Sequence, residues 1–204
     1  MRKLALALVC LTCAVTAPSP ASAHSWRPPG DTSGTDIPNI THGEMTVITR
    51  YQREILRLAE SVPQPDDRFR TLLRYAGLQY SNCLWGLMPG SISDEESPFN
   101  ECSHAYLAAS KELLMRMRAI EPVAAEAQTL VSKIDAEVTL TGAALIGCVY
   151  SGENFNTAEV IRPDWPGIFT HLPSLASTIA AIGILPMAAF VLSQVRRRRE
   201  PVKA

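Results

Sequence analysis

Apolar residues recur at helical spacing through the middle of this 204-residue chain. Residues 41–62, 65–87, 98–120 and 123–148 place apolar side chains three or four positions apart, which puts them on one face of an α-helix. The strict alternation of apolar and polar residues that is typical of a half-buried strand does not occur there. The pattern therefore predicts an all-α fold, with an antiparallel four-helix bundle over about residues 41–151.

Local signals bound these four expected helices. The segment Thr41–Glu44 matches a capping box, in which a threonine and a glutamate satisfy the free backbone N–H groups of a helix start. Pro63–Pro65 and Pro89–Gly90 are strong helix breakers. At Glu121–Pro122 the residue before proline is pushed out of the helical region. This last site predicts either a turn between two helices or a kink within one.

A fifth apolar stretch lies near the C-terminus. The 24 residues Leu172–Val195 carry no charge, and at a rise of about 1.5 Å each they can cross a hydrocarbon layer of ~30 Å. Four arginines, 196–199, follow directly. Basic residues flanking a span stay on the cytoplasmic side. The pattern predicts a transmembrane helix at 172–195, a basic cytoplasmic tail at 196–204, and a linker to the membrane at 152–171.

The N-terminus has the layout of a secretory signal peptide. Arg2 and Lys3 precede the apolar segment Leu4–Ala17, and Ala21–Ala23 forms an A-x-A cleavage site. We therefore expect residues 1–23 to be removed and the bundle to lie outside the cytoplasm, periplasmic or extracellular. Residues 24–40 are rich in proline, glycine and serine without periodicity, which predicts a flexible N-terminal arm.

The expected exterior portion, residues 24–173, is acidic. It contains 12 lysines and arginines against 19 aspartates and glutamates, a net charge of −7. Nucleic-acid binding depends on neutralising phosphates with basic side chains, so this balance argues against a nucleic-acid partner. It also argues against a domain that lies on anionic lipid.

Three cysteines remain after signal removal. In an up-down bundle, Cys83, Cys102 and Cys148 fall at the same pole, and oxidising compartments favour disulfides. Cys83 with Cys102 is the natural pair, because it closes the loop between two neighbouring helices. Cys148 is the rival partner for Cys83. The thiol left over is expected to be a buried, inert small hydrophobe.

Metal binding is an alternative at the same pole. Glu101–His104 has the E-x-x-H spacing of di-iron bundles, but such a site needs a second copy and glutamates from two further helices, which the sequence lacks. A zinc or copper site, or a thiol-redox centre, from Cys83, Cys102 and His104, with His42 as a further ligand, is the alternative to a disulfide. The prediction is that the protein has no cofactor or metal.

Arginines mark one part of the bundle as basic. Arg50, Arg53 and Arg57 share a face of the first helix, and Arg68, Arg70 and Arg74 lie on the second. An acidic partner or an anionic ligand would be attracted to such a face. The alternative is a solvated face with ion pairs one turn apart, between Arg50 and Glu54 and between Arg57 and Glu60.

No nucleophile elbow, nucleotide-binding loop, C-x-x-C or H-E-x-x-H motif occurs in residues 24–204, the chain expected after signal removal. We therefore expect a non-enzymatic, single-pass accessory or interaction subunit of a larger membrane protein assembly. Small residues favour close packing between membrane helices, and Ala176, Ala180 and Gly183 would line such a contact with other integral membrane proteins. Whether the chain also forms a homo-oligomer stays open.

The C-terminal layout supports one further alternative. A short motif, an apolar stretch and an arginine tail resemble the sorting signals of sortase and exosortase substrates. Residues Leu175–Thr178 resemble the start of an LAxTG sortase motif, but Ile179 stands where glycine is required. The resemblance implies a surface protein whose C-terminus is removed after export.

Overall fold

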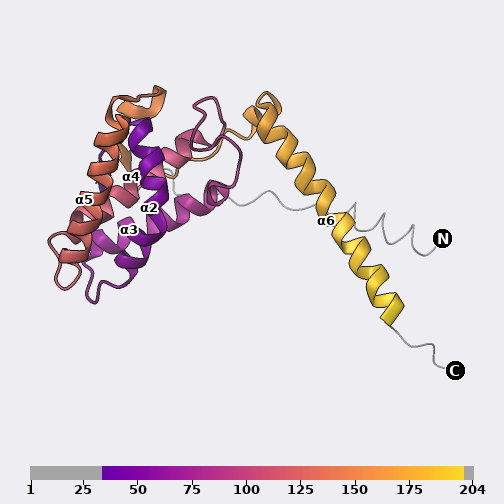
Figure 1. Cartoon of the computed structure of the whole chain (residues 1–204), viewed down its shortest axis with the longest axis horizontal. Helices are drawn as coiled ribbons and strands as arrows, with labels where there is room; N and C mark the ends of the chain where they lie inside the picture. The colour runs from indigo at the N-terminus through magenta and orange to yellow at the C-terminus, as the bar shows by residue number, and fades with distance from the viewer. Residues whose placement is uncertain (1–33, 200–204) are drawn as a thin grey trace. The chain divides into compact units, whose positions relative to one another are not determined.

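The structure is a computed structural model that describes residues 34–199 (Figure 1). Its long helices are α2 (His42–Glu60), α3 (Asp67–Asn82), α4 (Asn100–Met117), α5 (Ala124–Thr141) and α6 (Leu172–Arg199). Short 3-10 helices are η1 (Leu84–Gly86), η2 (Ala143–Leu145), η3 (Val149–Gly152) and η4 (Pro166–Phe169). Strands β1 (Asp36–Ile37) and β2 (Phe155–Asn156) form one antiparallel pair. The described residues are mainly helical, which confirms the predicted all-α class.

One hydrophobic core joins helices α2 to α5. Each helix contributes the apolar residues that its periodicity predicts, and these include Ile48, Ile55, Leu72, Leu113, Ala127 and Ile134. Helix α4 differs from the other three because all its residues from 102 to 110 are buried. A helix that is buried on every side lies at the centre of its domain. Helix α4 is therefore the element on which the others pack.

Helices α2 and α5 run side by side in opposite directions (Figure 1). At the start of α2, the N–H of Gly43 donates to the carbonyl of Ile146, just beyond α5, over 3.0 Å. Further along, Arg50 pairs with Glu137. Near the end of α2, Arg57 lies 4.0 Å from Glu126, in the first turn of α5. These contacts set the register of the two helices.

Two helices end earlier than their apolar patterns predict. Helix α3 stops at Asn82 instead of near Leu87, because the backbone turns left-handed directly afterwards. Helix α5 stops at Thr141, where Gly142 with a φ of 65° forms the C-cap, a conformation that glycine adopts at little cost. Between α4 and α5, Glu121–Pro122 lies in a turn, so the alternative of one kinked helix is wrong.

The segments that flank the four helices pack onto them. Ile37 and Ile40 are fully buried, and β1 pairs with β2, so the end of the segment expected to be a flexible arm is held against the core. Phe155 and Ile168, in the expected linker 152–171, are buried too. The rest of the arm and the predicted signal peptide lie outside the described residues.

Helix α6 covers the span predicted at 172–195. Within the part of the chain that the structure describes, however, no helix combines the length and the apolar character that crossing a membrane requires. The structure therefore does not support the predicted transmembrane helix. The three small residues predicted to contact other membrane helices, Ala176, Ala180 and Gly183, are exposed on α6.

Candidate functional site

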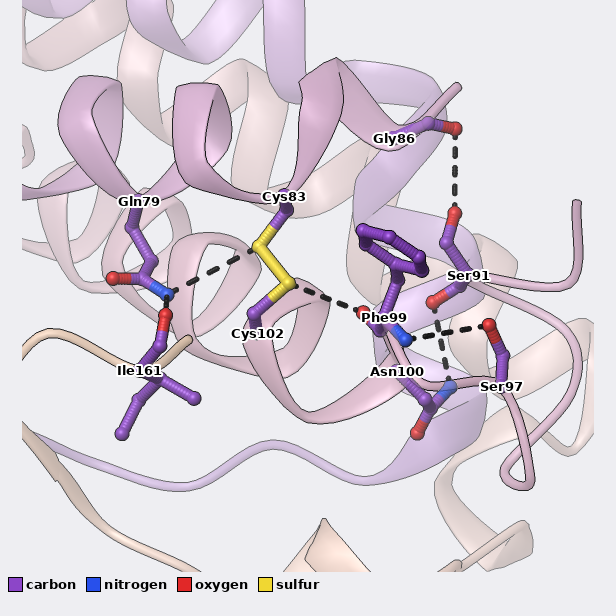
Figure 2. The surroundings of a disulfide bond; sticks show 9 residues. All are labelled: Gln79, Cys83, Gly86, Ser91, Ser97, Phe99, Asn100, Cys102 and Ile161. Atoms are coloured by element: carbon purple, nitrogen blue, oxygen red, sulfur yellow. Dashed lines mark hydrogen bonds between the residues drawn. A yellow bond between two sulfur atoms is a disulfide. The ribbon is translucent and has the colours of Figure 1, made fainter. Parts of the chain in front are cut away.

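Cys83 and Cys102 form a disulfide that joins the end of α3 to the first turn of α4 (Figure 2). Their Cα atoms are 5.8 Å apart, an ordinary separation for this bond, and both residues are fully buried. The sequence therefore identified the right pair, and the rival Cys148 keeps a free thiol. Gln79, one turn before Cys83, donates its side-chain amide to the carbonyl of Ile161.

The chain turns left-handed immediately after this disulfide. Leu84, Trp85 and Gly86 have φ angles of 51°, 55° and 63°, and residues with a Cβ adopt such angles at a cost. The disulfide holds the start of the turn, and the Ser91 hydroxyl donates to the Gly86 carbonyl over 3.3 Å at its end (Figure 2). A Cβ on Gly86 would lie 3.0 Å from the Tyr106 hydroxyl. The turn leaves Trp85 53% exposed.

Trp85 faces a cavity of about 650 Å³ between α2 and the turn, which we call the basic–aromatic groove. Its lining consists of Thr49, Arg50, Gln52, Arg53, Leu56, Arg57, Glu60, Tyr80, Trp85, Gly86, Ile92 and Tyr106. The volume lies within the range of ligand-binding clefts, roughly 300–1,000 Å³. The groove thus combines three predicted interaction residues, Arg50, Arg53 and Arg57, with aromatic side chains that sequence periodicity did not bring together.

The arginines of the groove differ in their partners. Arg50 and Arg57 each reach a glutamate of α5, as described above. Arg53, between them, makes no ion pair within residues 34–199. The pairs within α2 that a simple solvated face would show, to Glu54 and Glu60, do not form in the described residues either. The groove therefore presents one arginine without an ion pair among the described residues, Arg53, and its lining also contains the carboxylate of Glu60.

Two buried polar side chains, Gln52 and Tyr106, line the groove wall. Gln52 is only 7% exposed, and its side-chain nitrogen has no hydrogen-bond partner among the described residues. Burial raises the pKa of Tyr106 to about 12, so its phenol stays protonated at neutral pH. Tyr106 also packs edge-on against Tyr80, with ring centroids 5.0 Å apart. The wall is thus a set of hydrogen-bond donors beside aromatic rings.

The remaining predicted interaction residues lie elsewhere. Arg70 bonds to Asp67 and donates to the Pro65 carbonyl, both near the start of its own helix. Neither Arg70 nor Arg74 lines the groove. The predicted basic face therefore divides, and its α2 half lines the groove whereas Arg70 and Arg74 do not.

A second site lies where the start of α2, the middle of α4 and the turn before η3 meet. We call it the His–Cys cluster: His42, His104 and Cys148, whose possible ligand atoms all lie within 4.8 Å of one another. The Cys148 Sγ is 3.1 Å from His104 Nε2. Burial, with a smaller contribution from His42, lowers the pKa of His104 to about 4. His104 is therefore a neutral imidazole at physiological pH, able to serve as a ligand.

This cluster corrects the metal site considered from the sequence. His104 belongs to it, but Cys83 and Cys102 are consumed by the disulfide, and Cys148 supplies the sulfur. Cys148 is also half-buried instead of fully enclosed. The sequence placed Cys148 at the same pole as Cys83 and Cys102 but predicted an inert thiol there. Its contact with His104 was missed because the residue lies beyond the true end of α5.

Comparison with known proteins leaves the function to be inferred from this chemistry. No protein-family model matches the chain, and neither does any curated protein or solved structure.

Proposed function

We propose that this protein is a non-enzymatic, membrane-anchored interaction subunit whose exterior helical bundle binds an acidic segment of another membrane protein. The basic–aromatic groove carries the proposal. Its arginine row, its exposed tryptophan and the unpartnered amide of Gln52 form one continuous wall. Tryptophan, tyrosine and arginine are the residues that supply most of the binding energy at protein interfaces.

Electrostatics favour an acidic partner. Arg53 has no ion pair within residues 34–199, while the expected exterior portion of the chain has a net charge of −7. An acidic segment would be repelled by most of that surface and attracted to the groove, so binding would be both located and oriented by charge. The structure of the turn also supports a binding role, since backbone strain of this kind clusters at functional sites.

The location of this activity is supported by sequence features. The signal-like segment 1–23 favours export, and the uncharged stretch 172–195 before four arginines favours an anchor with a cytoplasmic tail. Partners in the same membrane follow from that arrangement. A larger membrane assembly is therefore where the acidic segment is expected.

Charge reversal in the groove tests the binding proposal. The probe is a fluorescently labelled oligoglutamate peptide with one central tyrosine, and its affinity for the full-length protein in mild detergent is measured by anisotropy. Arg53→Glu should weaken binding at least about 10-fold, because a desolvated attraction becomes a repulsion. Arg68→Glu makes the same charge change at an exposed position of α3, outside the groove, and should change affinity less than about twofold.

Equal losses in the two variants would mean that the peptide senses only net charge, and the groove would be discarded as the binding site. Trp85→Ala supplies a second reading that leaves charge untouched. It should weaken binding by a similar factor, because an exposed aromatic anchor is lost. Unchanged binding by Trp85→Ala would also count against the groove.

Processing and anchoring are tested separately by intact mass of the protein from its native membrane. We expect a chain that begins at His24 and retains the residues after Thr178. Loss of the residues after Thr178 would instead support the sorting-signal alternative. Leucine at Ala180 and Gly183 should weaken copurification with membrane partners while the exterior domain stays folded, because bulk there prevents close helix packing.

A further inference from the structure

We propose that His42, His104 and Cys148 form a binding site for a transition-metal ion that favours thiolate and imidazole ligands, with Zn²⁺ as the expected ion. The three residues come from the first position of α2, from α4, and from the residue before η3. This proposal is independent of the basic–aromatic groove, which shares no residue with the cluster.

The spacing of the cluster suits one ion. Ligand atoms bound tetrahedrally to zinc at about 2.0–2.3 Å lie roughly 3.5 Å from one another. In the protein the Cys148 Sγ and the His104 Nε2 are 3.1 Å apart, and no pair of possible ligand atoms exceeds 4.8 Å. These separations lie on either side of the tetrahedral value. Side-chain rotations alone can therefore close the site around an ion.

Backbone bonding holds two of the ligand-bearing segments together. The Ser151 hydroxyl oxygen accepts from the N–H of Cys148 over 2.8 Å and from the N–H of His42 over 3.1 Å. One side chain thus connects the turn before η3 to the start of α2. The N–H of Gly43 donates to the carbonyl of Ile146, which is a second hydrogen bond between the same two segments. The backbone positions of His42 and Cys148 are thus held together before any ion binds, which lowers the entropy lost on binding.

Both imidazoles carry unmet bonding capacity. The Nδ1 atoms of His42 and His104 are buried and have no hydrogen-bond partner among the described residues, and His104 is completely inaccessible to solvent. Buried polar atoms are normally paired, so the unpaired Nδ1 of His42 is an atom that a bound ion could satisfy, whereas the His104 atom that faces Cys148 is Nε2. A thiol–imidazole nucleophile is the competing interpretation. It would need a third group to orient His104, and the described residues provide none at Nδ1.

The cluster is open on one side. His42 and Cys148 line a hollow of about 290 Å³ together with Ser93, Asp94 and Glu95. Three protein ligands with an open face are typical of zinc sites that bind a further molecule, whereas purely structural sites are closed by four. Mg²⁺ and Ca²⁺ are poor candidates because they prefer oxygen ligands. When the sulfur–metal bond forms, the Cys148 thiol releases its proton to solvent.

Metal titration of the full-length protein in mild detergent tests the site. Isothermal calorimetry with Zn²⁺ alone should give one ion per chain, and Co²⁺ used as a probe should show a thiolate-to-metal charge-transfer band. Cys148→Ser and His104→Gln should each weaken Zn²⁺ binding by more than 100-fold, since loss of an outer-shell partner already costs about 10–100-fold. His171→Gln changes a histidine whose ring bonds to Asp94, outside the cluster, and should leave affinity within about threefold.

Circular dichroism of each variant shows whether it has folded, and Cys148→Ser changes only a half-buried sulfur, so that variant keeps the test valid. Zn²⁺ should also slow alkylation of Cys148 in the native protein at least about 10-fold, because the bound thiolate is no longer free to react. Failure to bind stoichiometric Zn²⁺ or Co²⁺, or binding that survives both Cys148→Ser and His104→Gln, would overturn the proposal. Isolation of the protein as a Cys148-linked dimer without metal would do the same.

Discussion

Helix α4 contributes Cys102 to the disulfide and His104 to the His–Cys cluster. Each of these regions contains cysteine sulfur, but only the disulfide uses it in a covalent link. Cys102 and His104 are two residues apart on α4, and at about 100° per residue they point to opposite sides of it. Cys102 meets Cys83 in a fully buried, covalent link. His104 meets the half-buried thiol of Cys148. Cys83 approaches the face of α4 that carries Cys102 and is oxidised, whereas Cys148 approaches the face that carries His104 and stays a free thiol.

The difference also separates two ways of bringing distant groups together. The disulfide joins residues 19 positions apart across one loop, and its energy comes from a covalent restraint on the unfolded chain. The cluster joins three segments, with His104 and Cys148 44 positions apart, through a helix cap and single hydrogen bonds. The disulfide should therefore contribute more to the free energy of unfolding, and the His–Cys cluster should contribute more to ligand binding and thiol reactivity.

Removing the disulfide should have the largest effect. The double variant Cys83→Ala with Cys102→Ala should lower the free energy of unfolding by about 3 kcal/mol, the chain-entropy value for a loop of this length. Urea unfolding without reductant measures the change. Cys148→Ala is the matched control and should stay within about 1 kcal/mol of the wild type. If Cys148→Ala lowers the free energy of unfolding as much as the double variant does, the disulfide does not stabilise the fold more than the His–Cys cluster.

Replacing His104 with leucine should move stability in the opposite direction. In the metal-free protein it should raise the free energy of unfolding by about 1–2 kcal/mol, because a buried imidazole nitrogen without a partner is removed. Thermal and urea unfolding in the presence of a chelator provide the measurement. A decrease of similar size in the free energy of unfolding would mean that His104 stabilises the fold, as the disulfide does.

The capping box at the start of α2 should link stability to the cluster. The Thr41 hydroxyl accepts from the N–H of Glu44 over 3.1 Å, next to His42. Thr41→Ala should cost about 1 kcal/mol and speed native alkylation of Cys148, since the first turn that carries His42 loosens. Thr139→Ala removes an exposed hydroxyl on α5 and should change neither quantity. Faster alkylation in both variants would contradict the link.

The smallest expected effect is a pH dependence from Glu44. Burial raises the pKa of this carboxyl, but its bonds to Lys111, at 2.7 Å, and to the Thr41 N–H outweigh burial and lower the pKa below 4.5. A lowered folded pKa contributes stability that is present above pH 4.5 and is lost as pH falls through the folded value. The difference between the wild type and Glu44→Gln should be below about 1 kcal/mol at pH 7 and should vanish in acid.

Urea unfolding at a series of pH values measures that difference. In a Lys111→Met background it should shrink at every pH, because the charged partner is absent. A difference that persists undiminished at low pH would show that Glu44 acts through packing instead of charge, and the cluster would then not depend on an ionised cap.

Local signals were enough for much of this structure. The capping box at Thr41 forms as predicted, the proline-containing breaks separate α2 from α3 and α4 from α5, and Cys83 pairs with Cys102. Each of these depends on residues that are near in sequence or on helical periodicity. Predictions of helix ends were weaker, because the left-handed turn at Leu84–Gly86 interrupts an apolar stripe that continues to Leu87.

The sequence by itself determined the helical class, the capped start of α2, the disulfide and the arginine row on α2, because those features depend on local spacing and backbone preference. Only the tertiary structure decided that Trp85 faces the arginine row, that Arg53 has no glutamate partner within residues 34–199, and that Cys148 meets His42 and His104. These arrangements join segments far apart in the chain. Their geometry is set by how α4 is packed among its neighbours, and no local pattern encodes that packing.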